Sequence, residues 1–434
     1  METGQEIIPE ADRRRGQRRL VGLGISGSFN GNLIGQTTSL FLLALGGGPF
    51  HIGLLATLSS LNQAVNLPAV LLMRRWGKVA LMVRVRVLAT TGAIALVVLA
   101  FVGTPGPGMV WLAIAFIGVR TLFMNVGNVA WWPLVRDNTA GSSMPAFLAR
   151  MRIGQRAGEL VLPLAIGWHL GTHPEPRQFG WLYALAIIST LAGALFVRGV
   201  CERREAAAAE GLLDRVRALA RITSIRRYFM FALARNLVFT SMVPFFVVAL
   251  TERGMPIIHF VWMASVVALG QLLTLYAWGR LVETYESRAV LTFSLLGCAV
   301  LGLFWLILPT GVTALTLAAA GFYLAWGTLE GGLSMGLTQA MMISVPEQNQ
   351  GEGFSLIAYA SAMGGAAGGL LGGVTFDWAN RLPDGHLIEP EIVYLVLAHA
   401  AIGIVYLLLR KTEGYAQQAS LTELLGKLML RRTR

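Results

Sequence analysis

Long apolar runs separated by short charged islands restrict the folds open to this chain more than any other feature. Apolar residues make up 55% of the 434 residues and charged residues only 13%. A helix needs about 20 residues to cross the hydrocarbon core of a bilayer. Runs of that kind lie at residues 21–45, 52–73, 79–103, 109–132, 150–172, 179–199, 228–250, 258–281, 288–309, 312–342, 353–378 and 391–410. The sequence therefore predicts an all-α integral membrane protein with twelve transmembrane helices.

The basic residues predict which side of the membrane each loop faces. Most of the 35 lysines and arginines lie in the N-terminal arm, in alternate loops and in the C-terminal tail. Only Arg177, Arg253 and Arg381 fall in the intervening loops. Because cytoplasmic loops carry an excess of Lys and Arg, both termini are predicted to be cytoplasmic. The expected location is a bacterial-type cytoplasmic (inner) membrane or a membrane derived from it. The same distribution explains the net charge of +12 without nucleic acid as a partner.

Polar segments recur in step with the apolar runs, which indicates an internal duplication. FLLALGGGPF at 41–50 resembles FVVALTERGMPI at 246–257, and VRDNTAG at 135–141 matches VPEQNQG at 345–351. Repeated halves are typical of transporters. The predicted parts are a basic N-terminal arm (1–20), a six-helix half (21–199), a cytoplasmic linker (200–227), a second six-helix half (228–410) and an amphipathic tail (411–434).

Two charged segments follow helices 2 and 8, at matching places in the two halves. The first, MRRWGK, contains Arg74, Arg75, Gly77 and Lys78, and the second, GRLVETYESR, contains Gly279, Glu283 and Arg288. Together with the helix count and the central linker, they resemble the major facilitator superfamily (MFS), whose signature in these loops is GxLxDRxGRK. The resemblance implies two pseudo-symmetric six-helix halves and gate loops that close the cytoplasmic side. Arg74 stands where the first signature has its acid.

Two charged residues lie deep in predicted spans. Arg120 is near the middle of the span at 109–132, and Glu330 lies within the span at 312–342. A charge near the bilayer centre costs about 2.5 to 3.5 kcal/mol on insertion scales, so it normally faces a cavity or a partner. The resemblance implies that these two helices line a central cavity. In one interpretation Glu330 carries a proton and Arg120 holds an anionic group; in the other they form a static ion pair or lock.

Further polar residues mark the faces of these and neighbouring helices. Arg235 lies near the start of its span, so its side chain can either face a cavity or snorkel back to the cytoplasm. The asparagines can also form hydrogen bonds between helices, each of which stabilises the helix packing by about 0.6 kcal/mol. The candidates for substrate binding or coupling are Arg120, Glu330, Arg235, Asn30, Gln36, Asn125, Asn128 and Asn236.

Metal and cofactor chemistry have little support in the sequence. Five histidines (His51, His169, His173, His259 and His386) fall on the predicted outer side, where a cation such as iron would enter, but their spacing matches no defined metal site. No metal ligand is assigned and no cofactor is expected. The sequence contains no nucleotide-binding glycine loop before a lysine and no HExxH, so the chain is predicted not to be an enzyme.

These features together predict a secondary active transporter that moves a small solute by alternating access. Proton coupling and an anionic or polar organic solute are the favoured interpretation. A metal-ion transporter of the same fold and a non-transporting assembly or sensor protein of that fold stay open as alternatives. The expected partners are the solute or ion and the lipid bilayer, and the chain is expected to be a monomer.

Overall fold

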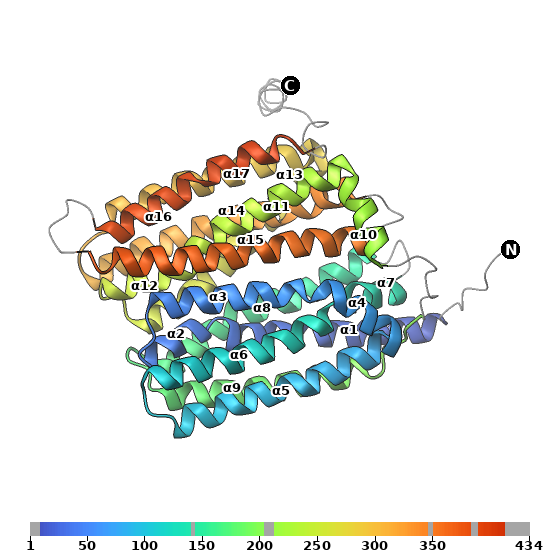
Figure 1. Ribbon diagram of the computed structural model, residues 1–434, viewed down its shortest axis with the longest axis horizontal. Helices are drawn as coiled ribbons and strands as arrows, with labels where there is room; N and C mark the ends of the chain where they lie inside the picture. The colour runs from blue at the N-terminus through green and yellow to red at the C-terminus, as the bar shows by residue number, and fades with distance from the viewer. Residues whose placement is uncertain (1–8, 140–143, 204–211, 346–349, 383–388, 413–434) are drawn as a thin grey trace. The chain divides into compact units, whose positions relative to one another are not determined.

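The structure is a computed structural model that describes residues 9–139, 144–203, 212–345, 350–382 and 389–412, and in those ranges it contains helices and no strand (Figure 1). Nine of the described helices are long and apolar enough to cross a membrane, or ten when one bent pair is counted as a single span. In lipid a chain must satisfy its backbone hydrogen bonds internally, which helices do. The all-α membrane prediction is therefore confirmed, whereas the count of twelve spans is not.

Two of the expected spans fail this test for different reasons. The run at 21–45 is divided among α1 (Glu10–Asn30), a π-helix (Gly31–Gly35) and α2 (Thr38–Ala44), so no single apolar helix covers it. The run at 150–172 belongs to α8 (Met144–Leu170), where Arg156 and Glu159 interrupt the apolar sequence.

Internal contacts divide the chain into two compact units. The N-terminal unit comprises Met1–Gly47 and Asn62–Ala209, and the C-terminal unit comprises Gly48–Leu61 and Glu210–Arg434. These units differ from the expected halves in that most of α3 (Pro49–Ala64) groups with the C-terminal unit. The reason is its packing against α15 (Gln350–Ala379), where a Cβ on Gly53 would come within 2.5 Å of the Gly369 carbonyl oxygen.

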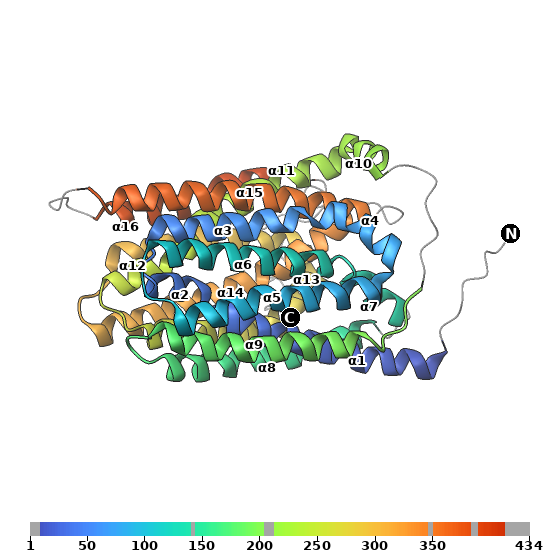
Figure 2. The same cartoon turned by 60° about the horizontal axis from the view of Figure 1, so that its bottom comes forward.

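The N-terminal unit is organised on α5 and α1. Besides α1, α2 and α8, this unit contains α4 (Asn66–Trp76), α5 (Lys78–Val102), α6 (Pro107–Asn128), α7 (Trp131–Asn138) and α9 (Pro176–Val197). α5 runs along α6 and α9, and α1 packs on α8 and α9 (Figure 2). We call the end at which α5 begins and α9 ends the linker end of this unit, because the chain leaves there for the C-terminal unit.

The bend between α3 and α4 follows from a proline. The two helices meet at 44°, with Val65 between them. Pro68 has no N–H to donate to the carbonyl four residues earlier, and its ring crowds that carbonyl. A kink at this place is the expected response of a helix to an internal proline, and the run at 52–73 is consequently bent.

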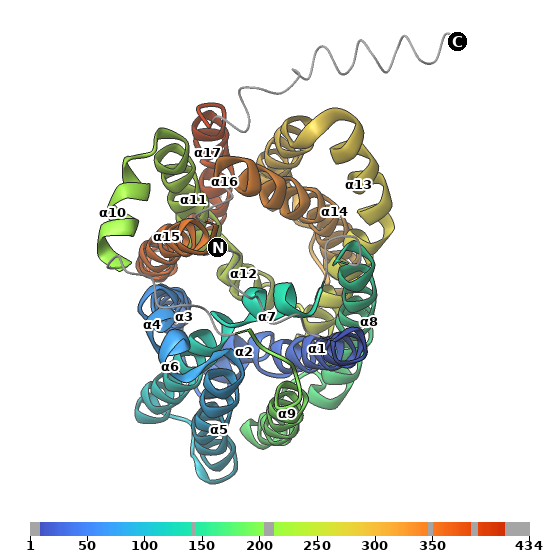
Figure 3. The ribbon, with the colours of Figure 1, turned by 90° about the vertical axis from the view of Figure 1, so that its right-hand side faces the viewer.

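The C-terminal unit is built on two long helix pairs. Its elements are α10 (Leu212–Arg221), α11 (Thr223–Met242), a 3₁₀-helix (Val243–Phe245), α12 (Phe246–Glu252), α13 (Ile257–Leu301), a 3₁₀-helix (Gly302–Ile307), α14 (Val312–Ser344), α15, α16 (Pro390–Ala400) and α17 (Ile402–Leu409). α13 packs along α14, and α11 packs along α15 (Figure 3). Glycines permit both approaches: a side chain at Gly327 would collide with the Val267 carbonyl, and one at Gly368 with the Leu237 carbonyl. Small residues of this kind let helix backbones pack closely in membranes.

The second charged segment is helical, which corrects the prediction of a loop. Gly279 and Arg288 both lie within the single helix α13. Two separate stretches still qualify as spans: Ile257–Val282 lies within α13, and Ser287–Ile307 continues from α13 into the following 3₁₀-helix. The segment contains no proline, and residues 280–283 (RLVE) are compatible with a helix. The side chain of Glu283 and the predicted tail from residue 413 onward lie outside the described part of the chain.

Replacing Gly327 by alanine should weaken the pairing of α13 with α14. The added Cβ has no room beside the Val267 backbone, and overpacking typically costs about 1 to 3 kcal/mol. Gly321→Ala on the same helix is the matched control, because a Cβ there meets nothing within 4 Å. Thermal unfolding in detergent should rank Gly327→Ala below Gly321→Ala. Equal stability of the two variants would contradict the close approach.

Candidate functional site

A cavity of about 320 Å³ lies within the C-terminal unit, among α11, α14 and α15. Its polar lining consists of Tyr228, Arg235, Asn236, Glu330, Ser334, Thr338 and Ser361, and its apolar lining includes Phe231, Leu337 and Ile357. The cavity thus offers a cation, a carboxylate, an amide and hydroxyl groups within an apolar wall. A few convergent polar groups in an apolar concavity are typical of a small-molecule site.

Glu330 is held at this cavity by the packing of α13 on α14. Its Oε2 accepts a hydrogen bond of 3.3 Å from Nε2 of Gln271, a residue of α13 that is 9% exposed. On the same interface, the Trp278 indole N–H donates to the Thr328 carbonyl at 2.8 Å. A Cβ on Gly332 would come within 2.9 Å of the Trp278 ring. The carboxylate is therefore positioned by a neighbouring helix rather than left on a mobile surface.

Arg235 enters the same cavity from α11. Its guanidinium lies over the Phe239 ring, 4.9 Å from the ring centre, and its charge interacts with that of Glu330. Phe239 is one turn farther from the helix start, so the side chain does not bend back toward that start as snorkelling requires. The structure thus favours the cavity-facing interpretation of Arg235, and it brings Arg235 and Glu330 to one site.

Asn236 also lines this cavity, and its Nδ2 donates to the Ala232 carbonyl of its own helix at 2.9 Å. Sequence reasoning did not single out Gln271, Ser334 or Tyr228, whose hydroxyl donates to the Leu337 carbonyl at 3.0 Å. Polar residues of these types are common in spans, and no sequence signal separates those that meet a cavity from those that bond locally.

Arg120 has a different environment, inside the N-terminal unit. The residue is 6% exposed, and its Nη2 donates a hydrogen bond to Oδ1 of Asn30, which is 4% exposed. Asn30 in turn donates from Nδ2 to the Ala186 carbonyl at 3.0 Å and to the Thr190 hydroxyl at 2.6 Å. The described partner of Arg120 is thus an amide that is anchored to α9, while Glu330 meets Gln271 and Arg235 in the other unit. The predicted common space of Arg120 and Glu330 stays a prediction.

The remaining polar candidates do not join this cluster. Gln36 follows the π-helix and is exposed, Asn128 is exposed at the last residue of α6, and Asn125 is half-buried. Of the four amide candidates in the N-terminal unit (Asn30, Gln36, Asn125 and Asn128), Asn30 is the one that is buried and bonded to Arg120.

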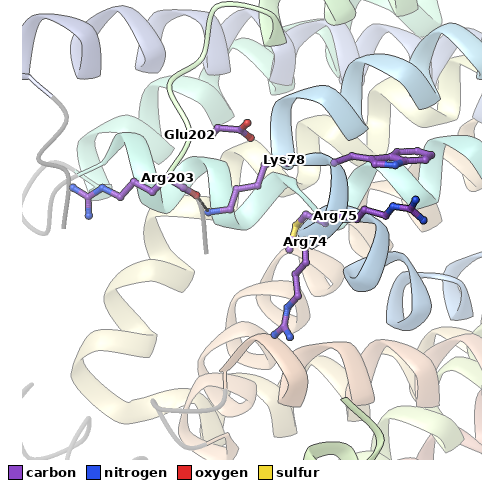
Figure 4. A pocket seen from close by; sticks show the side chains of 8 residues that line it. Arg74, Arg75, Lys78, Glu202 and Arg203 are labelled. Atoms are coloured by element: carbon purple, nitrogen blue, oxygen red, sulfur yellow. Dashed lines mark hydrogen bonds between the residues drawn. The ribbon is translucent and has the colours of Figure 1, made fainter. Parts of the chain in front are cut away.

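The first charged segment forms a compact polar site at the linker end of the N-terminal unit (Figure 4). Between α4 and α5, Gly77 has a φ of +85°, and a Cβ there would come within 2.7 Å of Glu202 Oε1. The positive φ favours glycine at this turn, because other residues rarely adopt that conformation. A pocket of about 210 Å³ is lined here by Met73, Arg74, Arg75, Trp76, Gly77, Lys78, Glu202 and Arg203.

Lys78 is the centre of this site. Its Nζ donates to Asp137 Oδ2 at 2.8 Å and to the Arg203 carbonyl at 3.0 Å, and both Lys78 and Asp137 are buried. The Arg203 N–H donates to the same carboxylate oxygen at 3.0 Å. Glu202 accepts from the Val79 N–H at 2.7 Å, at the start of α5, where a helix favours negative charge. Arg74 stands where the family signature has its acid. In this protein the carboxylates at the site come instead from Asp137 on α7 and from Glu202 in the segment after α9.

Three of the five histidines of the predicted outer side have local partners. The Gly48 N–H donates to His51 Nδ1 at 3.2 Å, His259 bonds the Thr316 hydroxyl at 3.0 Å, and His169 bonds the Gln178 carbonyl at 3.1 Å. Within the described ranges, no group of three or more His, Cys, Asp or Glu side chains is arranged to hold a metal ion. His386 lies outside those ranges.

Comparison with known proteins adds a family and a fold. The family model of the Major Facilitator Superfamily matches residues 20–369. Among solved structures, the nucleoside transporter NupG superposes with a TM-score of 0.66 at 14% identity, over 92% of this chain and 99% of that one. No curated protein matches the sequence.

Two further structures show the same fold with other cargoes. A D-xylose–proton symporter has a TM-score of 0.67 at 10% identity, with 93% of this chain and 98% of that one covered. A bacterial homologue of the iron transporter ferroportin has a TM-score of 0.64 at 14% identity, with 92% and 99% covered. At these identities the likeness establishes the fold alone.

Neutralising Asp137 should destabilise the N-terminal unit. Asp137→Asn leaves Lys78 buried without its carboxylate, and breaking a buried ion pair in this way costs about 3 to 5 kcal/mol. The double variant Lys78→Met/Asp137→Leu should recover most of that loss, because it removes both charges. Glu10→Gln, which breaks an exposed pair with Arg14, should change little. Unfolding measurements that place Asp137→Asn beside Glu10→Gln would refute the role of the buried pair.

Proposed function

The chain belongs to the Major Facilitator Superfamily and is a membrane transporter rather than an enzyme, and from this premise we propose that it is a proton-coupled secondary active transporter. The proposed cargo is a small polar or anionic organic solute, moved by alternating access. The observation that carries the proposal is the cavity in which Arg235 and Glu330 lie together.

The proposed coupling uses the two charges of this cavity. In one state Glu330 is ionised and its charge is balanced by Arg235. When a proton binds to the Glu330 carboxylate, the positive charge of Arg235 is released to attract an anionic or strongly polar solute group. When the proton leaves, the carboxylate competes with the solute for Arg235, which favours release. Coupling therefore requires no group beyond one carboxyl, one guanidinium and the solute.

Packing around the pair supports this role. Gln271 donates to Glu330 whether the carboxyl is ionised or protonated, because a protonated carboxyl retains an acceptor oxygen. Phe239 covers one face of the Arg235 guanidinium, and contact with an aromatic face stabilises a cation while it exchanges anionic partners. The cavity can thus keep both groups in place through a change of charge.

We also propose the membrane arrangement that the basic residues indicate. Both termini and the linker end of the N-terminal unit would face the cytoplasm, in a bacterial-type inner membrane or one derived from it. The protein would act as a monomer. A metal cargo is less compatible with this cavity, because Arg235 repels a cation at the carboxylate that would have to bind it.

Glu330→Gln should separate coupling from transport. In proteoliposomes with an imposed pH gradient, a screen of labelled carboxylates, sugars and nucleosides should first identify a solute that the wild type accumulates. The Glu330→Gln variant should lose gradient-driven accumulation of that solute by at least about tenfold, yet retain exchange of solute between the two sides without a gradient. The amide keeps the size and the acceptor oxygen of the side chain but cannot cycle a proton.

Glu389→Gln is the matched control for this experiment. Glu389 is an exposed carboxylate of the same unit, outside the cavity, and Arg253 retains Glu391 as a partner when Glu389 is neutralised. This variant should behave as the wild type. Unchanged gradient-driven accumulation in Glu330→Gln would exclude Glu330 as the proton carrier.

A further inference from the structure

The N-terminal unit encloses a second arginine beside Arg120. Arg86 belongs to α5, which begins at Lys78, so it lies about 12 Å along the helix at 1.5 Å per residue. Its exposed fraction is 6%, the same as that of Arg120. The predicted span at 79–103 includes Arg86, and the structure shows that its side chain is buried.

The two arginines are neighbours because α5 and α6 approach each other closely. A Cβ on Gly92 of α5 would come within 3.0 Å of the Arg120 Cβ. The positive charges of Arg86 and Arg120 interact repulsively. On its other side, the Arg86 guanidinium lies against α9: a Cβ on Gly193 would be 3.0 Å from Arg86 Nη1 and 2.8 Å from Ser26 Oγ.

The surrounding helices provide no acid to balance these charges. α5, α6 and α9 contain neither Asp nor Glu, and α1 has its two acids, Glu10 and Asp12, in its first turn. Two other described acids of this unit have cationic partners, Asp137 with Lys78 and Glu159 with Arg156. Glu202 sits at the start of α5.

The arginines themselves retain unused hydrogen-bonding capacity. Arg120 donates to Asn30, which is uncharged. Nε of Arg86 is buried and has no hydrogen-bond partner in the described part of the chain. A guanidinium stays protonated in proteins and has five donors, and a buried charge normally requires a charged partner. Two such groups lie side by side, and neither α5, α6 nor α9 carries a carboxylate that could balance them. The balancing charge is therefore left to a ligand.

We propose that the N-terminal unit binds an oxyanion between Arg86 and Arg120. The ligand class is a small molecule or ion with a carboxylate, phosphate or sulfate group, whose oxygens match the planar donor fork of arginine. Asn30, itself fixed by Ala186 and Thr190, orients Arg120 toward the ligand. This site lies in a different unit from the Arg235–Glu330 cavity and does not rest on proton coupling, so binding can be measured without a gradient.

The test is anion binding to the purified full-length protein in neutral detergent. Sulfate, phosphate, acetate and succinate are titrated calorimetrically against a chloride background of constant ionic strength, with thermal unfolding as a second readout. We expect at least one oxyanion to bind and to raise the unfolding temperature, whereas additional chloride does not. Arg86→Gln and Arg120→Gln should each weaken binding roughly ten- to a hundredfold, since hydrogen bonds to charged groups are lost.

Arg84→Gln is the control. Arg84 precedes Arg86 by two residues on α5, but it is exposed and lies over the Trp76 ring at 5.1 Å. The Arg84→Gln substitution should leave the affinity of the protein for the oxyanion unchanged. Arg86→Lys guards against misfolding, because it retains the charge; this variant should bind the oxyanion more weakly than the wild type and more tightly than Arg86→Gln.

Two results would overturn the proposal. One is oxyanion binding that is equal in the wild type and in the double variant Arg86→Gln/Arg120→Gln. The other is a wild type that binds none of the four oxyanions and whose unfolding temperature none of them raises. Neither result depends on whether the protein accumulates solute, so failure here is distinguishable from failure of the proposed transport function.

Discussion

The cost of removing a charge from water decides what lies beside each ionised side chain inside this protein. Lys78 and Asp137 are buried together, and their bond draws in the backbone of Arg203, so one ion pair fixes the start of α5, the end of α7 and the segment that follows α9. Arg235 and Glu330 share one cavity. Arg120 is held by an amide that α9 anchors. In each case the helices around the charge are arranged so that it is bonded or paired.

The two units meet this requirement in different ways. The C-terminal unit places a cation, Arg235, and an anion, Glu330, at one cavity. The N-terminal unit places two cations together among helices α5, α6 and α9, which carry no acid. The two compact units thus differ in the charge of their interiors, one of which pairs a cation with an anion while the other encloses two cations.

Apolar runs predict most of this fold, because the requirement for internal backbone hydrogen bonds in lipid is independent of the side-chain partners. The burial of Arg120 was predictable because a charge near the bilayer centre normally faces a cavity or a partner. Its bond to Asn30, the neighbourhood of Arg235 and Glu330, and the burial of Arg86 were not, since each depends on which helix faces which. The helical state of Gly279 to Arg288 was also missed, because charge in that segment resembles a loop when hydropathy alone is considered. The bend before Pro68 was within reach of the sequence.

The π-helix at Gly31–Gly35 has a geometric effect on everything that follows it in the first span. A π-turn contains more residues than an α-turn, so it rotates the side chains after it relative to those before it. Asn30, before the widened turn, is enclosed and holds Arg120, whereas Gln36, after it, is exposed. The widened turn therefore separates an inward-facing segment that ends at the partner of Arg120 from a segment that begins with an exposed amide.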